Sequence, residues 1–261
     1  MRVVFLGDIF AEPGRNAVKN GLRELIEKYK PNFVVANGEN AAHGAGITYE
    51  IALEIHSYGV DVITGGNHTF DKKVFWDKFE MFPYLLRPAN FPLGALGKGH
   101  VVIEKGGLAL GVLNLQGRVE MQPIDSPFEI GMNIIKEIRK KTSYIIVDFH
   151  AEATAEKEAL GYYFDGMVSA VVGTHTHVQT ADEKILPNGT AYISDVGMCG
   201  VEDSVIGLDK EIAIKRFTTG MPWNFKPAEG SATLHYVVID IDSSGLATQI
   251  ERGKWKKTSN T

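Results

Sequence analysis

Residues 1–40, MRVVFLGDIFAEPGRNAVKNGLRELIEKYKPNFVVANGEN, contain a complete strand–helix–strand unit. The β-branched and aromatic run Val3–Leu6 predicts a strand. Apolar residues then recur at steps of three and four over residues 14–29, which predicts a helix with one buried face. Phe33–Ala36 is the next predicted strand. A unit of this kind implies a parallel sheet with crossover helices, so the sequence predicts an α/β fold.

The same alternation continues through most of the chain. A helix that Thr48 can cap and Gly59 can end precedes a third strand, Val60–Thr64. Two stretches rich in glycine and proline, Pro83–Gly99 and Val196–Gly230, are expected to be long loops, one of which walls the substrate pocket. The other predicted elements are a hairpin of Val101–Glu104 and Leu108–Leu115, a helix around Ile130–Ile138, a strand Tyr144–Phe149, a helix Ala151–Leu160, a strand Met167–Val172, and a closing hairpin of Ser231–Asp242 and Leu246–Ile250.

Composition narrows the class of protein. With 261 residues, 44% hydrophobic and 23% charged, the chain suits one globular domain, expected over 1–253, with a basic tail, 254–261, expected to fray. The net charge of −5 argues against an extended nucleic-acid surface.

Cys199 is the only cysteine, so no intrachain disulfide can form. The first apolar run is too short for a signal peptide, and no run could span a membrane. A cytoplasmic protein is expected, with the oligomeric state, including a homo-oligomer, left open.

Metal-capable side chains follow five of the predicted strands. In open α/β sheets, ligands bind outside the carboxyl ends of the strands, so these groups can meet in one crevice. Glycine precedes the polar group in four of the five segments, which leaves room for an ion or phosphate near the backbone. The residues are Asp8, Glu39 with Asn40, Asn67 with His68, His150, and His175 with His177.

These residue types predict a centre of two metal ions. Carboxylate, amide oxygen and imidazole form a mixed O/N donor set that iron, manganese and zinc accept. Two neighbouring ions need a bridging carboxylate, and Glu39 is the natural candidate. His68 directly follows the candidate ligand Asn67, so its side chain is better placed to act as a general acid than as a ligand. Asp148, Asp195 or Glu152 could orient a ligand histidine through its second nitrogen.

Each residue also has a simpler interpretation. Asp8 alone could cap a turn or helix, and Asn40 and Asn67 could be turn-formers. On an extended segment, His175 and His177 would project to the same side, although an isolated pair of this kind is often a surface coincidence. The remaining histidines are assigned to structural or surface positions, with His43 in the loop after Asn40 as the one to reconsider. These remaining histidines are His43, His56, His100 and His235. Taken together, the metal-capable residues at five strand ends favour a metal centre over the simpler interpretations.

The motifs also resemble those of a known superfamily. Gly7-Asp8, Gly38–Asn40, Gly66–His68, His150 and Gly173–His177 resemble, in order and spacing, the five motifs of calcineurin-like metallophosphoesterases. The longer stretches FLGDIFAEPGR, NGENAAHGAGIT, TGGNHTFD, DFHAEATAEKEA, VVGTHTHVQTAD and YISDVGMCG resemble the bacterial YmdB-like branch, described as 2′,3′-cyclic-nucleotide phosphodiesterases.

The resemblance implies a fold and a ligand set. The fold would be a four-layer α/β sandwich of two mixed sheets flanked by helices. Glu39 would bridge two divalent ions, iron or manganese with zinc as an alternative, and His68 would protonate the leaving oxygen or stabilise the phosphate. Phe10 stands where the superfamily usually has a histidine, and Asn40 would fill that place. One ion would be held by Asp8, Glu39, Asn40 and His177, and the other by Glu39, Asn67, His150 and His175.

The implied activity is hydrolysis of 2′,3′-cyclic nucleoside monophosphates to 3′-phosphates by a metal-activated hydroxide. The partner would be a small phosphorylated substrate. Two alternatives stay open at this stage: a phosphomonoesterase or nucleotidase with the same two ions, and a regulatory metal-binding protein that acts through partners.

Overall fold

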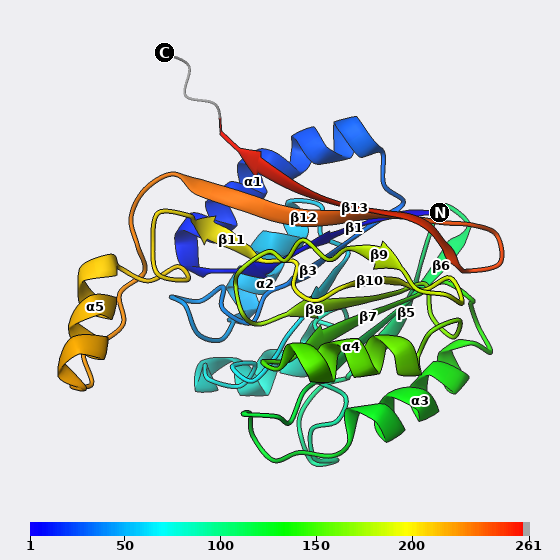
Figure 1. Ribbon diagram of the computed structural model, residues 1–261, viewed down its shortest axis with the longest axis horizontal. Helices are drawn as coiled ribbons and strands as arrows, with labels where there is room; N and C mark the ends of the chain where they lie inside the picture. Colours follow the sequence, from blue (N-terminus) through cyan, green and yellow to red (C-terminus); the bar gives the residue numbers. More distant parts are fainter. Residues whose placement is uncertain (258–261) are drawn as a thin grey trace.

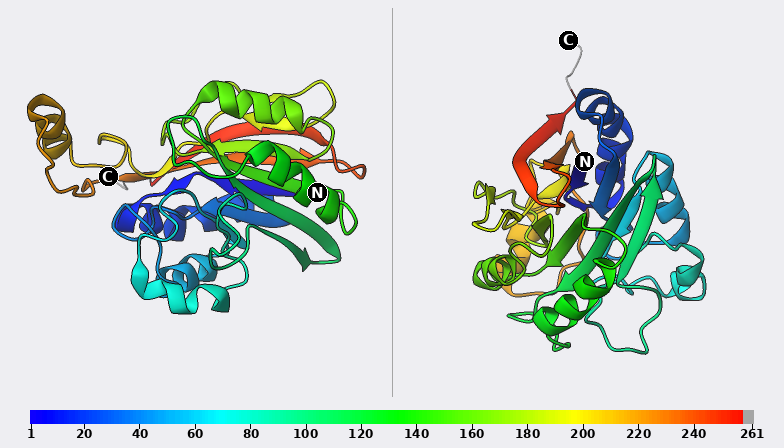
Figure 2. Two further views of the ribbon diagram at one scale, coloured as in Figure 1. Left: turned by 90° about the horizontal axis from the view of Figure 1, so that it is seen from below. Right: turned by 90° about the vertical axis from the view of Figure 1, so that its right-hand side faces the viewer.

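The computed structural model describes residues 1–257 and contains two mixed β-sheets with helices on both outer faces (Figures 1 and 2). None of the described helices is both long enough and apolar enough to cross a bilayer. The helices are α1 (Ala11–Tyr29), α2 (Tyr49–Ser57), the 3₁₀ helix η1 (Lys73–Met81), α3 (Pro127–Ile138), α4 (Thr154–Tyr163) and α5 (Lys210–Thr219).

The first sheet grows from the N-terminal strand–helix–strand unit. β1, β3 and β4 are parallel neighbours, as the sequence predicts, and β12 and β13 extend the sheet by antiparallel pairing. The sheet order is β2-β11-β12-β1-β3-β4, with β13 paired to β12. Its strands are β1 (Arg2–Leu6), β2 (Asp8–Ile9), β3 (Phe33–Asn37), β4 (Val62–Thr64), β11 (Met198–Val201), β12 (Ala232–Ile241) and β13 (Ala247–Lys256).

The second sheet has the order β5-β6-β7-β8-β10-β9. Strands β6, β7, β8 and β10 are mutually parallel, whereas β5 and β9 pair antiparallel at the two edges. The predicted hairpin across Gly106 and Gly107 is present as β5 and β6. The strands are β5 (His100–Lys105), β6 (Leu108–Gln116), β7 (Ile145–His150), β8 (Ala170–Thr174), β9 (Lys184–Ile185) and β10 (Ala191–Ile193).

The helices and the two sheets form four layers, and an apolar cluster lies between each adjacent pair of layers. This arrangement confirms the expected four-layer sandwich. Val3, Phe5 and Val112 belong to the cluster between the two sheets. Alternate residues of the same strands, such as Val4, face the opposite way, toward α1 and α2. On the second sheet, Leu113 and its neighbours pack against α3 and α4. The period-two alternation of each buried strand therefore supplies two apolar faces, one for the other sheet and one for a helix layer.

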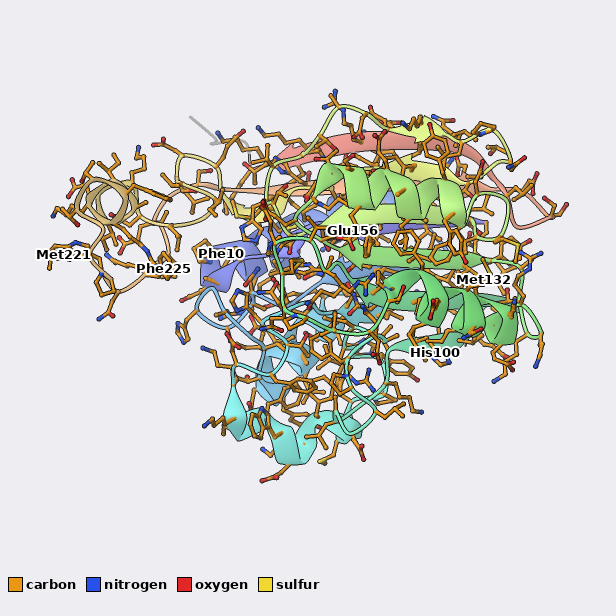
Figure 3. All side chains as sticks on the ribbon, turned by 60° about the horizontal axis from the view of Figure 1, so that its bottom comes forward. Phe10, His100, Met132, Glu156, Met221 and Phe225 are labelled. Atoms are coloured by element: carbon orange, nitrogen blue, oxygen red, sulfur yellow. The ribbon has the colours of Figure 1, made fainter. Side chains whose placement is uncertain are left out.

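The structure corrects two expectations about the irregular segments. Residues 196–230 are not one long loop, because they contain β11 and α5, and α5 projects from one side of the body (Figures 1 and 3). Met221 and Phe225 lie on this projection and are exposed. The tail does not fray from residue 254, because β13 continues through Lys256 and Trp255 packs against Gly21 of α1. Residues 258–261 of that predicted tail lie outside the described part of the chain.

A buried ion pair fixes the loop that follows β8. Lys157 of α4 donates to Asp195 at 2.9 Å, and the two side chains are only 2% and 1% exposed. Asp195 also accepts hydrogen bonds from the backbone and hydroxyl of Thr176. The pair therefore ties a helix of the outer layer to the segment that carries His175 and His177.

We predict that Lys157→Met lowers the free energy of unfolding by about 3 kcal/mol, because it leaves a buried carboxylate without its cation. The matched control is Lys184→Met, which removes the half-exposed pair with Glu158 and should cost less than about 1 kcal/mol. Urea denaturation of both variants measures the difference. Equal losses in the two variants would contradict a special role for the buried pair.

Candidate metal centre

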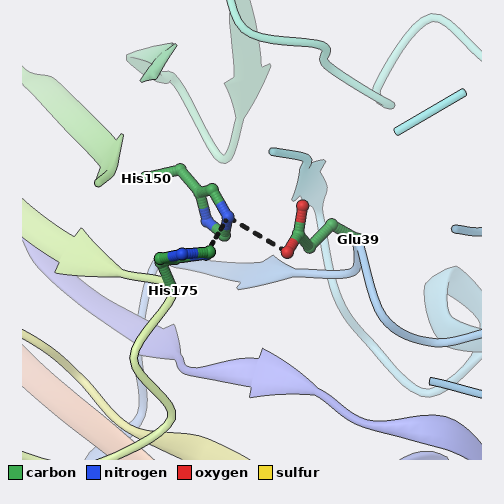
Figure 4. A group of neighbouring side chains, drawn as sticks. All are labelled: Glu39, His150 and His175. Carbon is green, nitrogen blue, oxygen red and sulfur yellow. Dashed lines mark hydrogen bonds and ion pairs between the residues drawn. The ribbon is translucent and has the colours of Figure 1, made fainter. Parts of the chain in front are cut away.

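The centre lies at one end of the sandwich, where both sheets deliver residues. Asp8 follows β1 and Glu39 follows β3 in the first sheet, whereas His150 ends β7 in the second. Glu39, His150 and His175 form a group whose ligand atoms all lie within 4.8 Å of one another (Figure 4). Contributions from both sheets converge here because the carboxyl ends of the parallel strands meet at this end.

Four of the predicted ligands form a group centred on His150. Its Nε2 lies 3.0 Å from Glu39 Oε1, 3.0 Å from Asn67 Oδ1 and 3.0 Å from His175 Nδ1. Its other ring nitrogen, Nδ1, lies 2.9 Å from Thr174 Oγ1. Three donor atoms thus face one point, while the hydroxyl of Thr174 orients the ring of His150 from behind.

The other predicted ligands form a second group that shares Glu39. Asn40 Nδ2 lies 3.1 Å from His177 Nε2 and 3.1 Å from Glu39 Oε1. Asp8 Oδ1 lies 3.9 Å from His177 Nε2. Phe10 packs edge-on against the ring of His177, with 5.5 Å between the ring centroids. All seven residues singled out as ligands therefore lie together, with Glu39 between the two groups.

His68 is placed differently from the seven. Its backbone N–H donates to Glu39 Oε2 at 3.0 Å, so the residue is anchored at the centre. Its side chain is 39% exposed, and its Nδ1 lies 2.8 Å from Asp71 Oδ2. The imidazole is therefore partly exposed, and within residues 1–257 its Nε2 has no hydrogen-bond partner. Asp71 was not predicted, although its spacing of three residues from His68 is a local signal.

Within residues 1–257, the potential metal-binding group of Glu39, His150 and His175 includes none of the remaining histidines. His43 and His56 are exposed, and His56 Nδ1 lies 2.7 Å from the carbonyl of Val60. His100 and His235 are half-buried, and His235 accepts a hydrogen bond from the backbone of Met198.

The residues that contact the candidate ligand histidines are partly different from those predicted. Glu152 lies 3.1 Å from His175 Nε2, as one prediction had it. Asp148 acts through Thr174, whose hydroxyl donates to it at 2.7 Å, and Asp195 contacts Thr176 rather than a histidine. The carbonyl of Ile206, 2.9 Å from His177 Nδ1, was missed because a backbone acceptor leaves no signal in the sequence.

The backbone of the His175–His177 segment is not extended. His175 has a φ of 106° and His177 a φ of 66°, both in the left-handed region that costs side-chain-bearing residues of order 1–3 kcal/mol. The prediction that the two histidines project to one side of an extended segment is therefore wrong, since β8 ends at Thr174. Both imidazoles still reach the centre because the loop itself turns them there.

Electrostatics couples the buried groups. Burial by itself would lower the pKa of His150, but the carboxylates of Glu39, Asp8 and Asp148 raise it to about 9. Burial would raise the pKa of Glu39, but the charge and hydrogen bond of His150 lower it to about 2. Burial and the charge of His150 lower the pKa of His175 to about 3. Burial raises the pKa of Asp8 well above its usual value.

The donor set fits divalent metal ions. Asp8 Oδ1 is buried without any hydrogen-bond partner, which is costly unless another group binds it. Gly66 leaves no room for a side chain, because a Cβ there would lie 2.3 Å from both Glu39 Oε2 and the His150 ring. Carboxylate, amide and imidazole donors suit iron, manganese and zinc, which need neutral histidines and ionised carboxylates.

Comparison with known proteins identifies the family. The model of the YmdB-like protein family matches residues 4–252. The chain belongs to the YmdB-like family. It is 54% identical over 253 residues to a Bacillus subtilis (strain 168) protein named 2′,3′-cyclic-nucleotide 2′-phosphodiesterase, covering 97% of this chain and 96% of that one.

Two solved structures agree with this assignment. A hypothetical protein from Thermus thermophilus superposes with a TM-score of 0.93 at 41% identity, covering 99% of this chain and 100% of that one. A phosphatase from Mycoplasma pneumoniae superposes with a TM-score of 0.92 at 35% identity, covering 98% and 93%. The family and fold class expected from the motifs are therefore confirmed.

We predict that Gly66→Ala lowers the bound metal while the protein stays folded, because the new methyl group must displace Glu39 or His150. The matched control is Gly94→Ala, where a Cβ meets nothing within 4 Å. Elemental analysis of protein purified without chelator, together with circular dichroism, measures both effects. Equal metal content in the two variants would show that the space beside Gly66 is not needed.

We also predict that metal binding releases a proton from His150 at neutral pH. A ligand imidazole must be neutral, whereas the pKa of His150 is about 9, so the affinity for metal should rise as pH increases toward 9. Calorimetry in buffers of different ionisation enthalpy measures the released proton. A binding heat that is independent of the buffer at pH 7 would contradict the prediction.

Proposed function

We propose that the protein is a metal-dependent phosphodiesterase that hydrolyses 2′,3′-cyclic nucleoside monophosphates to 3′-phosphates. The convergence of seven O/N ligands from both sheets, with Glu39 shared between two groups, carries this proposal. The name of the 54% identical B. subtilis protein supports both the enzyme class and the bond that breaks. The fold by itself does not identify the substrate.

The two groups of ligands suggest how the ions are shared. We assign one ion to Asp8, Glu39, Asn40 and His177, and the other to Glu39, Asn67, His150 and His175. When bound, two divalent ions lower the pKa of an attacking water and neutralise charge on the phosphate. Iron or manganese is the expected metal, with zinc as an alternative, and a cytoplasmic location remains a prediction.

His68 supplies the proton that the leaving oxygen needs. Its Nδ1–H donates to Asp71, which holds the ring in one orientation, and in the imidazolium form the second proton, on Nε2, is the one that can be donated. The backbone N–H of His68 donates to Glu39 Oε2, which anchors the residue beside the shared carboxylate. For a cyclic diester, proton transfer to O2′ as the P–O2′ bond breaks gives a free 2′-hydroxyl and a 3′-phosphate.

Two alternative functions are a phosphomonoesterase that uses the same ligands and a regulatory protein that hydrolyses no substrate. The decisive experiment incubates Mn²⁺-loaded protein with a 2′,3′-cyclic nucleotide and separates the 2′- and 3′-phosphate products by chromatography. We expect the 3′-phosphate alone, and loss of turnover with EDTA. Faster hydrolysis of p-nitrophenyl phosphate than of bis-p-nitrophenyl phosphate would favour the monoesterase, and no turnover of any of them would favour the regulatory protein.

We predict that His68→Ala keeps the metal but lowers kcat for a cyclic nucleotide by about 10²–10⁴-fold, as expected for loss of a general acid. The effect on bis-p-nitrophenyl phosphate should be much smaller, because p-nitrophenolate leaves without protonation. His43→Asn is the matched control, since His43 is exposed and asparagine tolerates its positive φ of 58°. Equal losses on the two substrates would instead assign His68 to phosphate binding, and loss of metal would make it a ligand.

A further inference from the structure

Gln116, the last residue of β6, is fully buried, yet neither atom of its side-chain amide has a hydrogen-bond partner. Buried polar groups are nearly always paired, and an unpaired one is costly. Within residues 1–257, the only other buried side-chain oxygen or nitrogen without a partner is Asp8 Oδ1, at the metal centre. No sequence motif singled out Gln116.

The register of the second sheet places Gln116 beside the centre. Gln116 is the direct neighbour of His150 across β6 and β7, and His150 is the direct neighbour of Thr174 across β7 and β8. Directly paired residues of parallel strands project to the same face of a sheet. Gln116, His150 and Thr174 therefore form a row at the carboxyl ends of three adjacent strands.

The row faces the first sheet. Asn114, two residues before Gln116 and thus on the same face, accepts a hydrogen bond from the backbone of Gly65 at 3.0 Å. Gly65 begins the loop that carries Asn67 and His68, so the face of β6 from which Gln116 projects is the one that this loop approaches. Gln116 is fully buried, as are its strand neighbour His150 and the nearby Asp8.

Hydrogen bonds hold the main chain at Gln116, whereas the side-chain amide has no hydrogen-bond partner. Its N–H donates to Asn90 Oδ1 at 2.9 Å, and Asn90 Nδ2 donates back to its carbonyl at 2.8 Å. A fixed backbone with an unpartnered amide is the arrangement of a preorganised binding group. A neutral amide can donate to a phosphate oxygen without adding charge to a centre that already holds metal ligands.

We propose that Gln116 is a substrate-binding residue whose Nε2 donates a hydrogen bond to a phosphoryl oxygen of the bound phosphodiester. This inference rests on the proposed function and deepens it, because it names a contact to the phosphate beyond the predicted ligands and His68. A hydrogen bond to a charged group corresponds to roughly a 10- to 100-fold change in affinity or rate.

The test is Gln116→Met, which keeps the size of the side chain and removes the amide. An unpartnered buried amide contributes nothing to folding, so the variant should melt at the same or a higher temperature and keep its metal. Its affinity for inorganic phosphate, measured by calorimetry on the Mn²⁺-loaded protein, should fall roughly 10- to 100-fold, as should kcat/KM for the cyclic nucleotide. Asn114→Leu is the matched control: it lies on the same strand and face, but its amide is paired, so it should lower the melting temperature.

Two results would overturn the inference. Unchanged phosphate affinity in Gln116→Met, or a lowered melting temperature with unchanged kcat/KM, would make Gln116 a structural residue. Phosphate binding separates this inference from the proposed function. If the wild-type protein binds phosphate through Gln116 but hydrolyses no diester, only the proposed function fails; if the wild-type protein binds no phosphate, the inference about Gln116 fails.

Discussion

The buried contact between Glu39 and His150 is the interaction on which the arrangement of this protein depends. Glu39 follows a strand of the first sheet and His150 ends a strand of the second, and their side chains meet at 3.0 Å with both fully enclosed. A carboxylate in such a place is stable only with a positive partner, which is either the imidazolium or a metal ion. The polar contacts from Asn37 and Thr64 to Asp148 join the same two sheets one layer deeper. The apolar core between the sheets therefore ends in a polar layer that contains the candidate metal centre.

Much of this arrangement could be predicted from the sequence, because the relevant signals are local. The strands are short apolar runs, and the candidate ligands lie at or soon after the ends of these runs, often behind a glycine. Residue type at a strand end was sufficient to predict that Asp8, Glu39 and His150 would lie together, and their side chains do meet in the structure. The four layers themselves came from the resemblance, since periodicity distinguishes buried strands but does not say how two sheets pack.

What the sequence did not reveal has physical causes. Helix α5 was missed because it buries only Ala213, so it lacks the apolar stripe by which amphipathic helices are recognised. The carbonyl of Ile206 and the hydroxyl of Thr174 contact the candidate ligands His177 and His150, but every residue has a carbonyl and threonine is common. Gln116 becomes visible only when register and hydrogen bonding are known together. The left-handed backbone at His175 and His177 likewise results from the loop conformation, because the residue types there do not predict a positive φ.

The sharing of ligands between the sheets has a consequence for the stability of the whole chain. A divalent ion held from both sheets, as proposed above, would bind the folded protein and not the unfolded chain, so free metal in the surroundings would shift the folding equilibrium by mass action. Once metal exceeds its dissociation constant, each further tenfold rise stabilises the fold by about 1.4 kcal/mol per occupied site. The lifetime of the protein in a cell, and not only its turnover, would then follow the supply of metal.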